Sequence, residues 1–234
     1  MIDVYNTRIL PPDARTQALI LKHKQEETSE EARRLKYALA LAQVPEAYWT
    51  LQMRGIPESE ATRDVRKYVQ NIERFVLRDH LGLFLFGGAG VGKTFLVSHI
   101  ARKALEHEFS VWFHDTIVFR GLVTTAAKSS GDGPDALLRL RTTISRADLL
   151  IVDGILQGDE NERIRNQIYK RLEEILRMRQ NFGATIFTQT VVDKTRRFPF
   201  PDDIMSLIEG MMHKVKVEGR DLRKNAATKK FQQI

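Results

Sequence analysis

The sequence predicts an α/β protein built on a mainly parallel sheet of five strands. Short apolar runs alternate with segments whose apolar residues recur at helical spacing, and this alternation is typical of parallel strands joined by helices. Helices would cover both faces of such a sheet, so its strands read as nearly continuous apolar runs. The expected strands are residues 81–87, 109–115, 148–154, 183–190 and 213–219.

Four longer helices are expected around these strands. The first would begin with Thr28 and Glu31 as a capping box and end before Pro45. The others span 59–76, 93–107 and 161–181, where apolar residues recur every three or four positions. We therefore predict a small helical N-terminal extension, residues 1–58, followed by an ATPase-like core, residues 59–234.

Composition narrows the class of protein. The chain has no cysteine, which excludes disulfides, thiolate zinc sites and thiol nucleophiles. No apolar run approaches the ~18 residues of a membrane span, and the N-terminus lacks a signal peptide pattern. We expect a soluble, cytoplasmic protein without a membrane partner. The net charge of +7, concentrated in residues 213–234, favours contact with a polyanion.

The stretch "GGAGVGKT", residues 87–94, fits the phosphate-binding pattern G-x-x-x-x-G-K-[ST]. It follows a predicted strand and opens a predicted helix, which is the context that this loop needs. Its glycines allow backbone N–H groups to surround phosphates, the lysine reaches the β and γ oxygens, and the threonine hydroxyl binds Mg²⁺. We expect ATP and Mg²⁺ as cofactors, with contacts to Gly87, Gly88, Ala89, Gly90, Val91, Gly92, Lys93, Thr94 and Phe95.

Two further residues complete the expected site. Asp153 ends the third strand and is the natural partner for Mg²⁺, although a turn aspartate after a buried strand is the alternative. Gln189, with Thr188 and Thr190 beside it, ends the fourth strand and is a candidate to hold the attacking water. The alternative for Gln189 is a polar residue that faces solvent at a strand end. The candidate catalytic residues are Lys93, Asp153 and Gln189, and the metal ligands are Thr94 and Asp153.

The order of these motifs resembles a known group of ATPases. The P-loop, "DLLIVD", "NQIYKRLEEILRMR", "FTQT" and the ending "VEGRDLRKN" are similar to the AAA+ ATPases of the DnaC-type helicase loaders and IstB-type transposition ATPases, over about residues 60–230. The resemblance implies an AAA+ (ASCE) fold, a homo-oligomeric ring, spiral or filament, and phosphate or Mg²⁺ roles for Lys93, Thr94 and Asp153. It places Arg223 near the nucleotide and gives the N-terminal extension the role of gripping a replicative helicase.

Three positions depart from that family pattern. Gly154 stands where the family has a Walker B glutamate, and Gln189 stands in place of the sensor asparagine. In "DIMSLI", Asp203 and Leu207 replace two arginines that include the finger supplied to a neighbouring subunit. The binding half of the site is thus intact, whereas the hydrolytic half is altered.

Other residues could restore hydrolysis. Asp159, Glu160 or Glu162 could orient the water, and Arg196 or Arg197 could act on a neighbouring subunit. Alternatively, the acids only favour the N-terminus of the next helix and the arginines lie in a solvated loop. We expect a slow or conditional ATPase whose ATP-bound form is the working state.

The expected partner of the assembly is single-stranded DNA. The resemblance directs attention to the region between strands two and three, which contains the basic residues Arg120, Lys128, Arg139, Arg141 and Arg146. Phe119 in the same region is a candidate to stack on bases, and burial in the core is the alternative. These basic residues could equally lie on solvated helix faces. Three functions stay open: a helicase loader, a transposition helper that assembles on duplex DNA with a transposase, and a nucleotide-locked adaptor. A small-molecule kinase is disfavoured because no lid arginines are evident.

Overall fold

The computed structural model describes residue 17 and residues 29–50, 52–54, 56–115, 144–155, 162–191 and 200–222. Five strands form one sheet in the order β2-β3-β4-β1-β5, and every neighbouring pair is parallel. The strands are β1 (Gly82–Gly87), β2 (Val111–Asp115), β3 (Leu149–Asp153), β4 (Ala184–Thr190) and β5 (Met212–Lys216). The predicted α/β class and the five predicted strands are confirmed.

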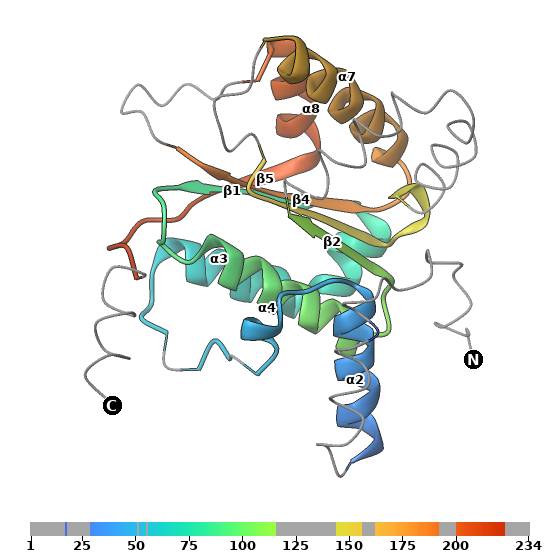
Figure 1. The fold of residues 1–234 in the computed structure, drawn as a ribbon, viewed down its shortest axis with the longest axis vertical. Coiled ribbons are helices and arrows are strands. Elements are labelled where there is room, and N and C mark those ends of the chain that lie inside the picture. The colour runs from blue at the N-terminus through green and yellow to red at the C-terminus, as the bar shows by residue number, and fades with distance from the viewer. Residues whose placement is uncertain are drawn as a thin grey trace.

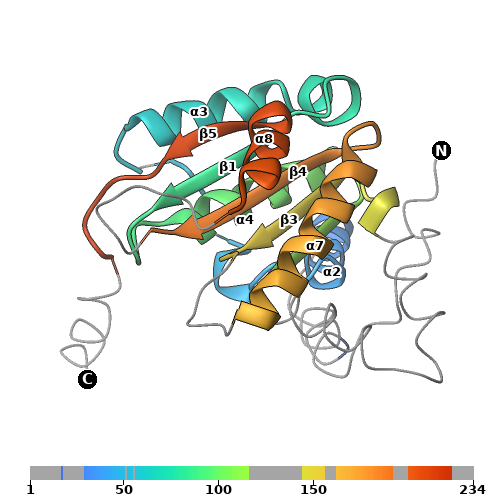
Figure 2. The same cartoon turned by 90° about the horizontal axis from the view of Figure 1, so that it is seen from above.

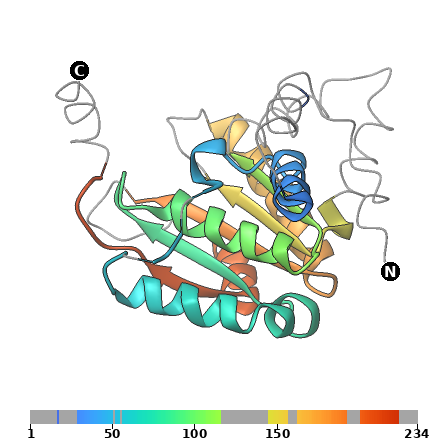
Figure 3. The ribbon, with the colours of Figure 1, turned by 90° about the horizontal axis from the view of Figure 1, so that it is seen from below.

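Helices cover both faces of the sheet, so the molecule has three layers (Figures 1 and 2). One face lies against α2 (Glu30–Leu41), α3 (Glu60–Gln70) and α4 (Lys93–Glu106), as Figure 3 shows from below. The other lies against α7 (Glu162–Arg179) and α8 (Asp202–Met211). We call these the α4 face and the α7 face.

Alternation along each strand sends side chains to these two faces in turn. In β3, Leu149 and Ile151 join the core on the α4 face, whereas Leu150 and Val152 join the core on the α7 face. Because both faces are covered, all four side chains are fully buried. This explains why the strands read as continuous apolar runs in the sequence.

The described N-terminal segment packs into the core on the α4 face. Leu39 and Ala40 of α2 and Trp49 are buried in the same cluster as Ile100 and Ala101 of α4. The Trp49 indole donates to Val44 O at 2.7 Å, and Arg102 donates to Trp49 O at 2.9 Å. Phe113 N of β2 also donates to Ala42 O at 3.0 Å, so residues 39–49 are attached both to the sheet directly and to the helix that follows the P-loop.

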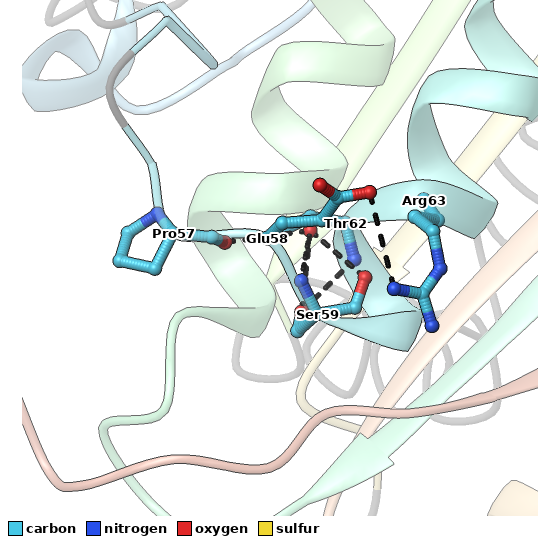
Figure 4. A network of polar contacts seen from close by, with 5 residues as sticks. All are labelled: Pro57, Glu58, Ser59, Thr62 and Arg63. Atoms are coloured by element: carbon cyan, nitrogen blue, oxygen red, sulfur yellow. Dashed lines mark hydrogen bonds and ion pairs between the residues drawn. The ribbon is translucent and has the colours of Figure 1, made fainter.

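The helix starts differ from the expected pattern in one place. The prediction of Thr28 as the cap of the first helix is wrong, because Ser29 is the N-cap and its Oγ accepts from Ala32 N at 3.1 Å. A capping box lies instead at the start of α3, where Ser59 N donates to Thr62 Oγ1 at 2.7 Å and Thr62 N to Ser59 Oγ at 3.2 Å (Figure 4). Thr62 Oγ1 also reaches Pro57 O, and Arg63 pairs with Glu58.

Two further boundaries differ from the sequence prediction. The helix expected over 59–76 ends at Gln70, and a π-helical turn follows at Arg74–Arg78. The helix α8 was not predicted, although its Ile204, Ile208 and Met211 are buried on the α7 face at helical spacing. Within the described ranges, no helix is both long and apolar enough to cross a membrane.

A fully buried arginine fastens α7 to the sheet. Arg179 donates to Thr185 Oγ1 at 2.8 Å and to the carbonyl oxygens of Ile144, Ala147, Asp148 and Ala184. Burial lowers the pKa of its guanidinium to about 10, so it stays charged at neutral pH. The last residue of α7 thereby joins the starts of β3 and β4.

We expect Arg179→Ala to lower the free energy of unfolding by about 3 kcal/mol or more, because it leaves several buried carbonyl groups without a donor. Urea denaturation measures this. Arg177→Ala is the matched control on the same helix: its pair with Glu173 is exposed, and its loss is expected to cost less than about 1 kcal/mol. Equal losses in the two variants would contradict the structural role of Arg179.

His114 on β2 makes stability depend on pH. Its side chain is buried against Trp112, with ring centroids 3.9 Å apart, and within the described chain neither ring nitrogen has a hydrogen-bond partner. Burial lowers the pKa of His114 from its ordinary 6.5 to about 4, opposed by the charge of Asp115. The unfolded chain therefore binds more protons than the folded one between these pH values.

We expect the free energy of unfolding to fall as the pH is lowered from 6.5 towards 4. His114→Phe should remove up to about 3 kcal/mol of that fall. Burial also lowers the pKa of His99 to about 4, so His99 contributes to the pH dependence in both proteins. The difference in free energy of unfolding between wild type and His114→Phe is therefore measured at each pH. His107→Phe, at an exposed histidine, is the control. Parallel stability curves for wild type and His114→Phe would contradict the assignment.

Candidate nucleotide-binding site

The P-loop connects the end of β1 to the start of α4. Gly90 and Gly92 have φ angles of 71° and 101°, in the left-handed region that glycine adopts readily. The buried Lys93 donates through Nζ to Gly87 O at 3.0 Å and to Gly88 O at 2.6 Å. Among the described residues no side chain caps the N-terminus of α4, whose first N–H groups point out of the helix towards the preceding loop.

The segment after β5 lies against this loop. Leu222 N donates to Gly90 O at 3.1 Å, and a Cβ atom added to Gly90 would lie 1.8 Å from Asp221 Oδ1. The left-handed backbone at this position favours glycine, and a Cβ here would also displace the Asp221 carboxylate. The contact links the C-terminal segment to the middle of the P-loop.

Two threonine hydroxyl groups hold the Asp153 carboxylate. Thr94 Oγ1, on the first turn of α4, donates to Asp153 Oδ2 at 2.8 Å, and Thr188 Oγ1, on β4, donates to Asp153 Oδ1 at 2.5 Å. Gly154 N in turn donates to Thr188 Oγ1 at 2.7 Å, so the Thr188 proton is directed at the carboxylate. Three separate elements thus meet at one aspartate.

These donor groups suit Mg²⁺ and a polyphosphate. Mg²⁺ prefers hard oxygen ligands, and Thr94 and Asp153 present a hydroxyl and a carboxylate in contact with each other. Lys93 and the uncapped start of α4 supply positive charge and N–H donors beside them. The residues present therefore fit both groups.

Gln189 lies on the other side of the sheet from Asp153. Its neighbour in register is Phe86, which packs in the core of the α7 face, and alternation along β4 separates it from Thr188 on the α4 face. The side chain of Gln189 is buried, and its Oε1 has no hydrogen-bond partner among the residues that the structure describes. The predicted water-holding role of Gln189 stays a prediction.

The structure describes four further residues that the sequence singled out, and the remaining ones lie outside the described ranges. Glu162 and Arg146 are exposed, Asp203 Oδ1 accepts from Ile204 N within α8, and Leu207 packs towards the α7 face. The residues outside the described ranges are Phe119, Arg120, Lys128, Arg139, Arg141, Asp159, Glu160, Arg196, Arg197 and Arg223.

The structure adds residues that sequence reasoning did not assign. Thr188 was considered only as a neighbour of Gln189, and Asp221 only as part of the charge count. Period-two alternation after Ile186 could have placed Thr188 on the α4 face. The approach of Asp221 to Gly90 depends on β5 pairing beside β1, which no local pattern specifies.

The strand order and the P-loop define an ATP-binding protein of the AAA+ class. The sequence model described as "IstB-like ATP binding protein" matches residues 15–229, and the chain belongs to this family. None of the curated proteins matches the sequence.

Solved structures with low sequence identity share the fold. The DnaC helicase loader has a TM-score of 0.59 and 17% identity over 74% of this chain and 100% of that chain. DnaI has a TM-score of 0.56 and 19% identity over 76% of this chain and 94% of that chain. AMPPCP-bound DnaA from Aquifex aeolicus has a TM-score of 0.56 and 17% identity over 82% of this chain and 56% of that chain. This chain therefore spans little more than half of the solved DnaA chain.

Thr188→Val tests the hydroxyl that orients Asp153. We expect the variant to lose about tenfold in affinity for ATP when Mg²⁺ is present, the value of about one hydrogen bond to a charged group. Titration with a fluorescent ATP analogue measures the affinity, and Thr188→Ser, which keeps the hydroxyl, should bind as wild type does. An equal loss when EDTA removes Mg²⁺ would show that Thr188 acts on the fold and not on the metal side of the site.

Proposed function

We propose that this protein binds Mg²⁺ and ATP between the P-loop and Asp153, and that its ATP-bound form delivers a replicative helicase to single-stranded DNA. The observation that carries the proposal is the contact between Thr94 on α4 and Asp153 on β3. It brings together the two groups expected to bind Mg²⁺ at the start of the helix that would face the phosphates.

Each residue of the site has a proposed role. The backbone N–H groups of residues 87–95 and the Lys93 ammonium bind the phosphates, and the Thr94 hydroxyl and Asp153 carboxylate hold Mg²⁺. When bound, Mg²⁺ neutralises charge on the phosphate oxygens. Arg223 is proposed to contact the nucleotide as well, and the bond from its neighbour Leu222 to Gly90 O supports this.

Hydrolysis is proposed to be slow or conditional. The residue after Asp153 is Gly154, with φ of 80°, where a glutamate side chain would require a left-handed backbone. Asp203 and Leu207 on α8 offer no positive charge to a neighbouring subunit. ATP would therefore persist long enough for the bound state to assemble, as a homo-oligomer, and to hold a partner.

Charge and chain organisation support the proposed partners. The net charge of +7 favours a nucleic acid, and phosphate contacts by Lys and Arg are independent of base sequence. We assign helicase binding to the segment 1–58. The fold that this chain shares with the solved chain of the DnaC helicase loader, matched over 100% of that chain, is the fold that a loader would need.

A second function is favoured by the family match. Membership in the IstB-like family favours a transposition helper that assembles on duplex DNA and recruits a transposase. The two functions differ in the DNA that the ATP-bound protein prefers. A protein that holds ATP without turnover would instead be a nucleotide-locked adaptor.

We expect the wild-type protein with a non-hydrolysable ATP analogue to bind a short single-stranded oligonucleotide more tightly than the same sequence as duplex. Lys93→Ala should lose nucleotide binding and the part of DNA binding that depends on it. Fluorescence anisotropy at several salt concentrations measures both, with a slope of about −0.7 per neutralised phosphate of single-stranded DNA.

A preference for duplex DNA would support the transposition helper over the loader. Wild-type protein without affinity for ATP would contradict both. Lys103→Ala, on the exposed side of the same helix, is the matched control for loss of a lysine charge and should behave as wild type.

A further inference from the structure

The residue that follows Asp153 at the carboxyl end of β3 is Gly154, which carries no carboxylate. After Asp153 the backbone turns at Gly154, whose N–H donates to Thr188 Oγ1, and Ile155 N donates to Thr188 O at 2.8 Å. The chain is thus drawn along the end of β4 directly after Asp153. The residue directly after Asp153 therefore supplies no base for the attacking water, and the candidates for one are groups on other described elements that reach this edge of the sheet.

The neighbouring strand places an aspartate beside Asp153. Strands β2 and β3 are parallel and paired from Val111 with Leu149 to Asp115 with Asp153. Both aspartates therefore end their strands at the same edge of the sheet, in strands about 4.8 Å apart. Asp115 is exposed, so water can reach it.

Both aspartates also lie on the face of the P-loop helix. Val111 and Phe113 of β2 join the core of the α4 face, as do Leu149 and Ile151 of β3. Side chains in a strand alternate with period two, so Asp115 and Asp153 follow on this same face. The bond from Thr94 to Asp153 confirms this face for Asp153.

Other polar groups within the described ranges lie farther from the Asp153 side of the P-loop and are weaker candidates for the base. His114 and Gln189 alternate onto the α7 face and are buried there. Glu162 begins α7, on the far side of the sheet from α4. Asp221 contacts Gly90, on the side of the P-loop where β5 lies, whereas β2 and β3 lie on the other side of β1.

We propose that Asp115 is the general base for ATP hydrolysis, supplied by β2 in place of a carboxylate after Asp153. The oxygen of a water molecule forms a bond to the γ-phosphorus as the bond from that phosphorus to the β–γ bridging oxygen breaks. The electron pair of the broken bond leaves with ADP, and the water proton passes to the Asp115 carboxylate and then to solvent. This inference rests on the proposed ATP-binding function.

Asp115→Asn tests the proposal with two readouts. Phosphate release in the presence of single-stranded DNA should fall by about 100-fold or more, the range of a general base. The affinity for ATP should stay close to wild type, and the protein recovered after incubation with ATP should hold ATP, where the wild type holds ADP. Asp115→Glu, which keeps a carboxylate, should restore part of the turnover.

Two further variants separate the alternatives. Glu108→Gln neutralises an exposed carboxylate in the turn before β2, at the opposite end of that strand, and should leave turnover and affinity unchanged. Glu162→Gln tests the alternative that Glu162, which follows Asp153 in the sequence, is the base. Loss of turnover in Glu162→Gln with normal turnover in Asp115→Asn would overturn the proposal.

Each remaining outcome also has a distinct meaning. Asp115→Asn with turnover like wild type, or with ATP affinity lost in parallel, would overturn the role of Asp115. Wild-type protein that binds ATP but forms no ADP with DNA would overturn it too, while the proposed ATP binding would stand. Wild-type protein that binds no ATP would refute the proposed function itself.

Discussion

The carboxylate of Asp153, held between two threonine hydroxyls, is the interaction on which the site depends. Thr94 belongs to α4, Thr188 to β4 and Asp153 to β3, so one pair of short hydrogen bonds fixes the relative position of three elements. Both hydroxyls donate, so the two hydrogen bonds orient the carboxylate from opposite sides of its own carbon. A charged group that is held in this way needs little reorganisation when a metal ion binds.

The sheet keeps this arrangement in place. Its apolar side chains fill a core on each face, and the buried guanidinium of Arg179 joins α7 to the starts of β3 and β4. The polar groups of the site lie at the opposite ends of the same strands. The Arg179 contacts thus lie at the amino ends of these strands, and the polar groups of the site lie at their carboxyl ends, where ligands commonly bind to parallel sheets.

Local patterns were sufficient to predict the P-loop and the strands. The loop needs eight contiguous residues, and each strand needs a short apolar run between glycines or polar residues. The helix α8 has only ten residues, which is shorter than the window of about 11 to 18 residues in which helical periodicity can be read from a sequence. The cap at Ser29 was missed because Thr28, one residue earlier, offers the same chemistry.

Contacts between strands could not be predicted in the same way. The bond from Thr188 to Asp153 and the register of Asp115 with Asp153 depend on which strands are neighbours and on their alignment. Neither is encoded within a short window, because the partners lie 35 and 38 positions apart in the chain. The acids nearest to Asp153 in the sequence lie at residues 159–162, whereas strand pairing brings Asp115 of β2 to the same edge of the sheet.

The most direct test is a crystal structure of the protein with Mg²⁺ and a non-hydrolysable ATP analogue. The account predicts Mg²⁺ bound to Thr94 Oγ1 at about 2.1 Å, with the Asp153 carboxylate in contact with the ion or its water shell and the phosphates within the P-loop. A nucleotide bound elsewhere, or a metal ion that contacts neither Thr94 nor Asp153, would contradict it.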